Sequence, residues 1–463
     1  MKRTLTLRGR TAPPPERLPR RPTGSITPAS FGQEQIWLHG QLAPDLPLYT
    51  ESLTIRHRGP LDPQALSRCF DELVRRHDIW RTTFAWSDGQ LRQEVLSTRV
   101  PRLSLTDLRH LPADEREPAA LRLAAEDLRR PFDLAREPAV RARLVYLSDE
   151  DQRLFLCLHH IVFDGISIYR VFLPDLAALY RIELGEPVPS PAEPPLQYGD
   201  FAYWERHGAD EAAMEPVLAY WRNVLAGAPN TIAVPTDRPR PPVQSFRGGL
   251  VRFELPPSLT ASLRSAALRE QCTLFMLLLT GFAVTLHRRS AQTDLLIGSV
   301  SGGRDRPELE RLIGYFLRIL VIRADLTGDP TFRELVQRIR AMLVEALSHD
   351  AVPFQWLVRA LAPTRDPGRG PLFQVTFSIE PPLPVLGAEW DLTEMDAGTT
   401  VAKFDLSLEL EDRGEEIAGR AIYSRDLFDP ETIASLTTEF AAVLAHAVDY
   451  PEAPVSAGAA TGP

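Results

Sequence analysis

The sequence predicts an α/β protein built from two lobes. Helical and strand-like apolar patterns alternate along the chain, which is typical of α/β architecture. The chain has 463 residues, whereas single hydrophobic cores stop growing near about 250–300 residues. The proline-rich stretch GEPVPSPAEPP at 185–195 would form an extended connector. We therefore expect five segments: a poorly ordered leader or linker over 1–23, a first lobe over 24–186, a connector over 187–195, a second lobe over 196–450 and a loose tail over 451–463.

Local signals predict individual elements along this plan. A helix should begin after Asp62, an N-cap candidate that is followed by proline at the first helical position. The apolar run 154–158 is typical of a short buried strand. An amphipathic helix should follow over 168–179, kinked or restarted at Pro174. The apolar run 274–286 is too short for a membrane span of about 20 residues and predicts a buried helix.

The heptapeptide HHIVFDG at 159–165 carries the clearest chemistry. It directly follows the predicted buried strand, and side chains alternate along a strand. One of His159 and His160 should therefore pack into the structure while the other points into a cleft. An imidazole with a pKa near ~6.5 is a natural proton acceptor at neutral pH. A purely structural histidine pair is the alternative, and a metal site is disfavoured because such sites need three or more converging ligands.

Composition excludes several classes of function. A net charge of −9 argues against general nucleic-acid binding, which requires a basic surface. The basic start runs into prolines without the apolar segment of a signal peptide, and no membrane association is indicated. Three cysteines, Cys69, Cys157 and Cys272, lie far apart in apolar surroundings and are interpreted as core residues in a reducing compartment. We expect a cytoplasmic protein, and a monomer.

The heptapeptide resembles the HHxxxDG signature of the condensation domains of nonribosomal peptide synthetases. Seven further segments are similar to motifs of that family and occur in its order: SFGQEQIW (30–37), RHDIWRTTF (76–84), YGDFAYW (198–204), VPTDRPRP (234–241), IGYF (313–316), HDAVPF (349–354) and RDPGRGPLFQVTF (365–377). Each match is weak by itself, but the ordered set covers roughly residues 28–430 and is specific.

The resemblance implies a fold and a reaction. Each lobe should resemble chloramphenicol acetyltransferase, and the two should form a V-shaped pseudo-dimer with a central channel. The donor acyl group would arrive as a thioester on the phosphopantetheine of an acyl or peptidyl carrier protein, and no cofactor would be bound by this chain. A small-molecule or carrier-bound amine or hydroxyl would attack it, so that the acyltransferase forms an amide or an ester.

The same resemblance assigns roles to residues. His160 corresponds to the catalytic histidine, either as general base or as a group that positions the nucleophile, and His159 supports it. Asp164 should form a structural, buried pair with Arg304, while the Gly165 N–H would help to bind the developing oxyanion. The segment KFDL at 403–406 resembles a recurrent segment of the second lobe and is interpreted as architecture.

Two positions are candidates for the substrate channel. Trp204 lies in the third of the matching segments, and packing in the core or between lobes is its alternative role. Arg318 stands in LRI (317–319), where the family usually has VNT after IGxF. An arginine facing the channel would recognise a carboxylate on an unusual acceptor, and an outward-pointing side chain is the alternative.

Two other functions stay open. One is an acyl-CoA-dependent or polyketide-releasing acyltransferase of the same superfamily, although the DFGWG motif of the plant-type enzymes is missing. The other is a catalytically silent domain that recruits carrier proteins, although such relatives generally lose the HH motif. No segment resembles an adenylation domain or a phosphopantetheine attachment site, so the protein should act either free-standing or as one domain of a longer synthetase.

Overall fold

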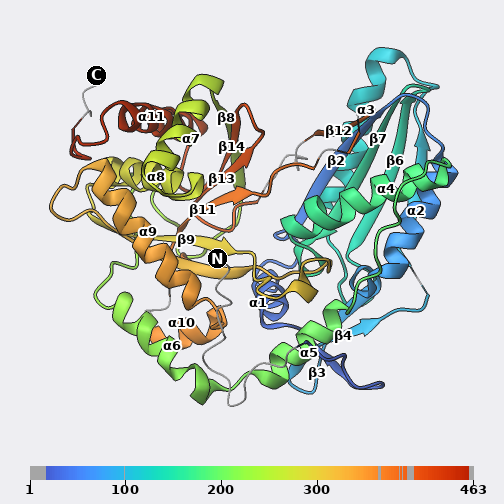
Figure 1. The fold of residues 1–463 in the computed structure, drawn as a ribbon, viewed down its shortest axis with the longest axis horizontal. Helices are drawn as coiled ribbons and strands as arrows, with labels where there is room; N and C mark the ends of the chain where they lie inside the picture. Colours follow the sequence, from blue (N-terminus) through green and yellow to red (C-terminus); the bar gives the residue numbers. More distant parts are fainter. Residues whose placement is uncertain are drawn as a thin grey trace.

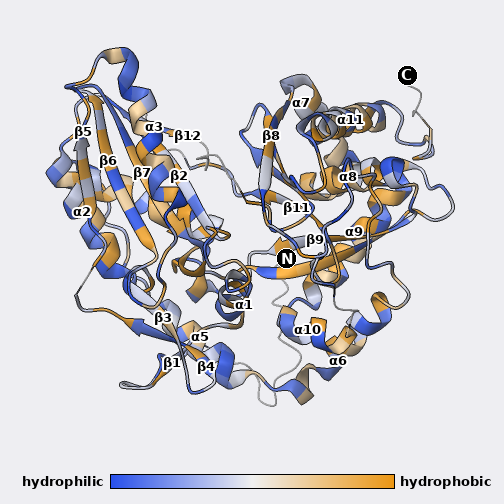
Figure 2. Cartoon of the chain, turned by 180° about the vertical axis from the view of Figure 1, so that it is seen from behind, coloured by the Kyte–Doolittle hydropathy of each residue, from blue (hydrophilic) through white to orange (hydrophobic). Residues whose placement is uncertain are grey.

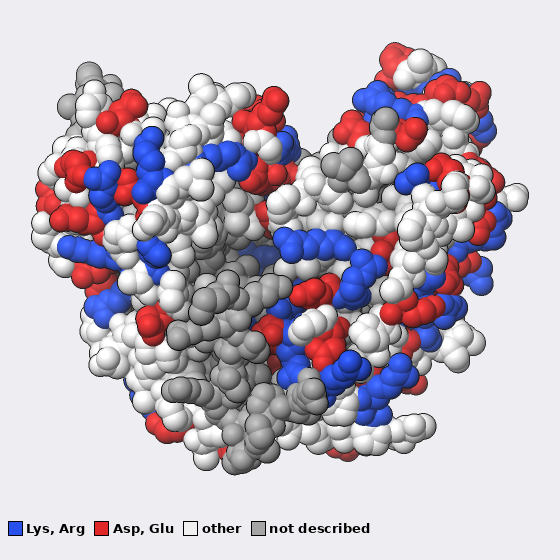
Figure 3. All heavy atoms as spheres, viewed as in Figure 1, with Lys and Arg blue, Asp and Glu red and all other residues white. Residues whose placement is uncertain are grey.

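The fold has two lobes that form a V, seen in a computed structural model that describes residues 17–98, 100–362, 366–384, 386–387, 389–393 and 401–457. Each lobe is centred on its own mixed β-sheet with helices packed against it (Figure 1). Residues 1–16 of the expected leader, 458–463 of the expected tail and Arg365 lie outside the described residues. The lobes face each other across a surface that is hollowed between them (Figure 3).

The first lobe contains a five-stranded sheet in the order β12-β2-β7-β6-β5. Strands β2, β7 and β6 pair antiparallel and β5 joins β6 in parallel. The strands are β2 (Thr50–Arg58), β5 (Leu103–Asp107), β6 (Val140–Ser148), β7 (Asp151–His159) and β12 (Trp390–Thr393). Strand β12 comes from the second half of the chain and pairs antiparallel with β2, so the second half completes the first sheet.

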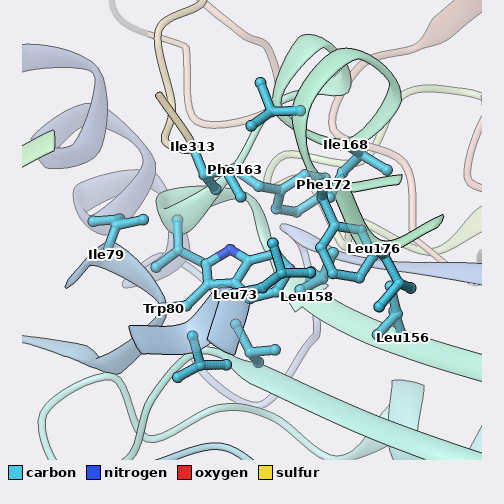
Figure 4. Packing of buried hydrophobic residues seen from close by; sticks show 14 of the residues in the cluster. Leu73, Ile79, Trp80, Leu156, Leu158, Phe163, Ile168, Phe172, Leu176 and Ile313 are labelled. Atoms are coloured by element: carbon cyan, nitrogen blue, oxygen red, sulfur yellow. The ribbon is translucent and has the colours of Figure 1, made fainter. Parts of the chain in front are cut away.

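Helices cover both faces of this sheet. On one face the largest buried cluster of the molecule packs around the fully buried Trp80 and joins residues of helices α2 and α4 to strand residues such as Leu156 and Leu158 (Figure 4). On the other face, alanines of α3 pack on Val145 and Phe155. The helices are α2 (Pro63–Arg76), α3 (Ala113–Arg129) and α4 (Leu173–Glu183), with α4 preceded by a π-helical turn over Ser167–Phe172.

A smaller layer closes the base of the first lobe. It consists of a three-stranded sheet in the order β1-β4-β3, helix α1, helix α5 and a short 3-10 helix. Their bounds are β1 (Thr27–Pro28), α1 (Phe31–Gly40), the 3-10 helix Asp78–Arg81, β3 (Thr82–Ser87), β4 (Gln90–Val95) and α5 (Tyr198–Gly208). Helix α1 begins with a capping box between Ser30 and Gln33, which fixes the start of the helix beneath the HHIVFDG segment.

The second lobe contains a six-stranded sheet in the order β10-β9-β11-β13-β14-β8. Strand β11 pairs in parallel with β9 and β13, and the remaining pairs are antiparallel. The strands are β8 (Gly248–Leu255), β9 (Asp294–Ser301), β10 (Arg318–Asp325), β11 (Val375–Glu380), β13 (Leu406–Asp412) and β14 (Ile417–Ser424). A short 3-10 helix, Pro307–Leu309, lies between β9 and β10.

Six helices surround the second sheet. Four contribute to one buried core with the sheet, and the apolar faces of the strands lie beneath them (Figure 2). These are α7 (Pro257–Arg269), α8 (Leu274–Ser290), α9 (Phe332–Ser348) and α11 (Pro430–Asp449). Helices α6 (Glu211–Val224) and α10 (Phe354–Leu361) form a separate core on the other face. Within the described residues no single helix is long and apolar enough to cross a membrane; α7 and α8 pass that test only together, with a bend of 107° between them.

The boundaries expected from the sequence differ in part from the packing. Leu18 of the expected leader is buried in the first core, and Val455 of the expected tail is buried in the second. Tyr198 and Phe316 follow the proline-rich connector but pack into the first core. Proline density marked the extended connector, but it carries no information on which core the following helix joins. The division into 24–186 and 196–450 therefore remains a prediction for the two lobes as separate units.

Candidate functional site

The HHIVFDG segment lies where β7 ends and the chain turns into the channel between the lobes. His159 is the last residue of β7, and His160 opens a single 3-10 turn over His160–Val162. The turn is fixed from two sides. The His160 backbone N–H donates to the Tyr49 carbonyl at 2.7 Å, and the Gln33 amide of α1 donates to the Ile161 carbonyl at 2.9 Å. These bonds fix the backbone that carries both imidazoles.

The two histidines are both half-buried but have different neighbours. His159 Nδ1 accepts a hydrogen bond from the Ile161 backbone N–H at 3.2 Å, and its ring packs against Tyr49 and Phe132. Burial lowers the pKa of His159 to about 3. His159 has the aromatic packing expected of the inward-facing imidazole, and the chain has already left the strand at His160. That His160 faces the channel stays a prediction.

His160 has an unprotonated ring nitrogen, Nε2, beside Glu51. Its Nδ1 lies 3.3 Å from the Phe163 carbonyl oxygen, which can only accept, so Nδ1 carries the proton and Nε2 the lone pair. The ring stacks on Phe163 with centroids 4.6 Å apart, and its side chain is 17% exposed. Burial lowers the pKa of His160, and the positive charge of Lys403 lowers it further. The imidazole is therefore neutral and able to accept a proton at neutral pH.

Asp164 is the centre of a buried hydrogen-bond network. Its side chain is 0% exposed and forms an ion pair with Arg304, whose side chain is 5% exposed, with N–O distances of 2.6 and 3.0 Å. Three further donors complete the carboxylate: the Ser167 N–H (2.7 Å), the Ser167 hydroxyl (2.8 Å) and the Phe316 N–H (3.1 Å). The network links the HHIVFDG loop to residues 304–316. Ser167, which takes part in it, was not identified from the sequence.

Gly165 contacts the second lobe closely. A Cβ at this position would lie 2.7 Å from Glu380 Oε2 and 3.3 Å from Pro381 Cδ, at the end of β11. Burial raises the pKa of Glu380 to about 7, and Arg420 opposes that shift. The small size of residue 165 is therefore explained by the approach of the two lobes. The oxyanion role of its N–H stays a prediction.

Two charged side chains that the sequence interpretation had not placed in the site lie beside His160. Glu51 of β2 has its Oε1 atom 3.9 Å from His160 Nε2, and Lys403 Nζ lies 3.8 Å from the same oxygen. Lys403 also lies 4.9 Å from the Tyr49 ring centroid. It belongs to KFDL, which was expected to be architectural, whereas Glu51 was not singled out in the sequence.

Trp204 and Arg318 line one pocket between the lobes. The pocket is bounded by α1 and α5 on one side and by residues 315–319 and 350–356 on the other, and it includes Tyr315, whose ring lies 5.9 Å from that of His160. Arg318 points into this region but forms ion pairs with Asp350 at 3.1 Å and Asp305 at 3.3 Å. Its charge is balanced within the protein, which weakens the carboxylate-binding role expected for it.

Charges of both signs line the surface around the channel, without a large patch of one sign on the face in Figure 3. Among the described residues, no group of three or more histidine, cysteine, aspartate or glutamate side chains could hold a metal ion. Cys69 and Cys157 are buried free thiols, and burial raises the pKa of each to about 12. The titratable groups placed to act on a substrate are those around His160.

Comparison with known sequences gives matches over nearly the whole chain. The family model for the condensation domain matches residues 24–461. Phosphinothricin tripeptide synthetase PhsC of Streptomyces viridochromogenes is 41% identical over 447 residues, which make up 96% of this chain and 41% of that protein. One of the subunits of linear gramicidin synthase from Brevibacillus parabrevis is 38% identical over 432 residues, or 92% of this chain and 8% of that one. The chain thus spans less than half the length of these curated relatives.

Solved structures give a matching picture. The X-domain from teicoplanin biosynthesis superposes with a TM-score of 0.81 at 30% identity, covering 95% of this chain and 99% of the X-domain chain. The same X-domain in complex with OxyB superposes with a TM-score of 0.80 at 30% identity, covering 97% of this chain and 98% of the other. The two-lobed fold is therefore shared over its full extent.

Proposed function

Because the chain belongs to the condensation-domain family, we propose that it forms an amide bond between an acyl group, held as a thioester on a carrier protein's phosphopantetheine, and an acceptor amine. Condensation domains of peptide synthetases catalyse peptide-bond formation, and their substrates arrive on carrier-protein domains. Two relatives are a tripeptide synthetase and a gramicidin synthase, which favours an amide product. The observation that supports the proposal is the neutral His160, whose side chain is 17% exposed and whose Nε2 carries the lone pair.

The chemistry assigned to His160 is proton transfer at Nε2. The acceptor nitrogen attacks the thioester carbonyl, the C–N bond forms and Nε2 accepts the proton that the nitrogen loses. The C–S bond then breaks, and the proton passes to the departing sulfur, so that the arm leaves as a free thiol. General-base help of this kind contributes typically ~10²–10⁴-fold to a rate. Positioning of the two substrates in the channel contributes at least as much.

The Asp164 network holds this base in place. A carboxylate with five donors cannot move without breaking several bonds in a region that excludes water. The HHIVFDG loop is thereby fixed against residues 304–316, and the imidazole keeps its direction without contact to Asp164. Asp164, Arg304 and Ser167 are positioning residues in this proposal, and His160 is the catalytic one.

The test uses a candidate carrier protein charged with an acyl-phosphopantetheine, mixed with this protein and a panel of amines and alcohols. Loss of the acyl group and formation of product are followed by mass spectrometry. Parallel reactions replace the carrier by acyl-CoA or the enzyme by His160→Ala. We expect a carrier-dependent amide whose rate falls about 10²–10⁴-fold in the variant.

The other outcomes separate the alternatives. Turnover from acyl-CoA alone would assign the protein to the CoA-dependent acyltransferases. Binding of the carrier without turnover would assign it to the domains that recruit carrier proteins. Product that persists unchanged in His160→Ala would contradict the catalytic assignment while leaving carrier dependence intact.

A further inference from the structure

The inference concerns Glu51, which the mechanism above does not use. Its side chain extends from β2, the strand that pairs with the end of β7 in the register Thr50–His159 and Glu51–Leu158. The backbone bond from His160 to Tyr49 fixes the same region. The carboxylate is therefore held beside His160 by strand pairing, and its position does not depend on a flexible loop.

The carboxylate has room for another donor. Its Oε1 lies 3.9 Å from His160 Nε2 and 3.8 Å from Lys403 Nζ, which is beyond ordinary hydrogen-bond length for either contact. Within the part of the chain that the structure describes, no hydrogen bond to the Glu51 carboxylate is formed. Its side chain is 25% exposed, so a substrate group can reach it. A group with two donors, placed beside this pair at hydrogen-bond distance from each, would satisfy both acceptors at once.

Two positive charges of the protein act on this carboxylate, those of Lys403 and Arg420. The sequence contains two lysines, Lys2 and Lys403, and its other basic side chains are arginines. The primary ammonium at the active site is thus one of two in the chain, and it approaches Glu51 from the second half of the sequence. An ammonium is a compact point charge with three donors, whereas a guanidinium is a planar fork. Lys403 Nζ and His160 Nε2 both approach Glu51 Oε1 without reaching hydrogen-bond length, so a substrate amine would compete with Lys403 for this carboxylate.

We propose that Glu51 selects a primary amine as the acceptor, by binding one N–H of the amine while His160 Nε2 accepts the other. This inference rests on the proposed function and names the group that recognises its acceptor. A primary amine offers two N–H donors and keeps its lone pair for the thioester carbonyl, but a hydroxyl offers one donor and cannot satisfy both acceptors. As the C–N bond forms, positive charge develops on the nitrogen and the Glu51 carboxylate stabilises it. Proton transfer to His160 and release of the thiol follow as above.

The test compares two probes that differ in one group. They are the amides of L-alanine and L-lactate with aminopantetheine, in which nitrogen replaces the thioester sulfur, so that they bind without reacting. Affinities are measured by calorimetry for the unmodified protein, for Glu51→Gln and for Glu115→Gln, an exposed glutamate of α3 that serves as the matched control. We expect the alanyl probe to bind about 10- to 100-fold more tightly than the lactyl probe, the range of one charge-assisted hydrogen bond. Glu51→Gln should remove that difference, and Glu115→Gln should keep it.

A second measurement does not depend on any substitution. Reductive ¹³C-methylation keeps the charge of each lysine and gives Lys403 an NMR signal, with Lys2 and the terminal amine as references. The alanyl probe should shift the Lys403 signal because it binds the same carboxylate, and the lactyl probe should not.

Equal effects of the two probes, or a preference that survives in Glu51→Gln, would overturn the proposal. Neither measurement requires turnover. A protein that prefers the amine through Glu51 but forms no product from any charged carrier would contradict the proposed function alone. A protein that forms the amide but treats the probes alike would contradict the role of Glu51 alone.

Discussion

At the scale of single residues, the charge of His160 determines how activity depends on pH. Its pKa is below 6.5 because of burial first and Lys403 second, while Glu51 acts in the opposite direction. The neutral form is the base, so kcat/KM should be constant at neutral pH and fall as pH drops through a value below 6.5. Removal of the positive charge in Lys403→Met favours the protonated imidazole, so the acidic limb should shift toward higher pH. A pH–rate profile of both proteins checks this; an unshifted limb would contradict it.

The Asp164–Arg304 pair determines whether the loop is held at all. Both side chains are almost fully buried, so Arg304→Ala leaves a carboxylate without its main counter-charge. The free energy of unfolding should fall by roughly 3–5 kcal/mol, measured by urea denaturation. Arg75→Ala is the control, because the Arg75–Glu193 pair is 58% exposed on both sides and should contribute no more than about 1 kcal/mol. Equal losses in the two variants would show that the network is not structural.

Much of this site could be predicted from one heptapeptide, because adjacent residues carry its chemistry. His159, His160 and Asp164 lie in one heptapeptide, and the resemblance to condensation domains pointed to Arg304 as the partner of Asp164. Glu51 and Lys403 could not be found in this way. They lie far apart in the chain and meet only because strand pairing and lobe packing bring them together, and no local spacing records such a contact.

At the scale of elements, the HHIVFDG loop approaches the end of β11 closely at Gly165. A Cβ in Gly165→Ala would lie 2.7 Å from Glu380 Oε2, so the glutamate or the loop must shift. We expect a clear loss of activity with a smaller loss of thermal stability. Because Glu380→Ala removes the clashing atom, the double variant should regain part of the activity of Gly165→Ala. Strictly additive losses in kcat/KM would contradict a direct contact.

Gly40→Ala is the matched control for that cycle, because a Cβ at Gly40 meets no atom within 4 Å. It should leave both activity and melting temperature unchanged. A loss in this variant comparable with that in Gly165→Ala would indicate a general sensitivity to glycine replacement.

Local sequence signals predicted the elements whose ends are determined by the residues at those ends. Asp62 caps α2 through bonds to the Gln64 and Ala65 N–H groups, and Pro63 lies in its first turn, as expected. The kink or restart expected at Pro174 stays a prediction, because the π-helical turn that ends at Phe172 passes into α4 at Leu173 with right-handed helical backbone on both sides. The short strand β12 could not be anticipated, because its partner β2 lies in the other half of the chain.

At the scale of the whole molecule, buried histidines make stability depend on pH. Burial lowers the pKa of His39 to about 4 and of His77 and His159 to about 3. In the unfolded chain these groups take up protons near pH ~6.5, so the unfolded state binds more protons below that value. The free energy of unfolding should therefore decrease as pH falls from about 6.5 to about 4. Each of the three histidines contributes at most about 1.4 kcal/mol per pH unit to this decrease. His77→Phe should reduce the dependence of the unfolding free energy on pH, measured by urea titrations at pH 7, 6 and 5. An unchanged dependence would show that His77 does not contribute to it.

Strand β12 has a consequence for any attempt to separate the lobes. A fragment that ends at the proline-rich connector lacks residues 390–393, so the outer edge of β2 loses its pairing partner and exposes a row of free N–H and C=O groups. Such an edge is a template for intermolecular pairing, so the isolated first half should self-associate or exchange strands with its neighbours. The second half of the chain supplies strand β12, which covers this edge and so protects the sheet that carries His160 from intermolecular pairing.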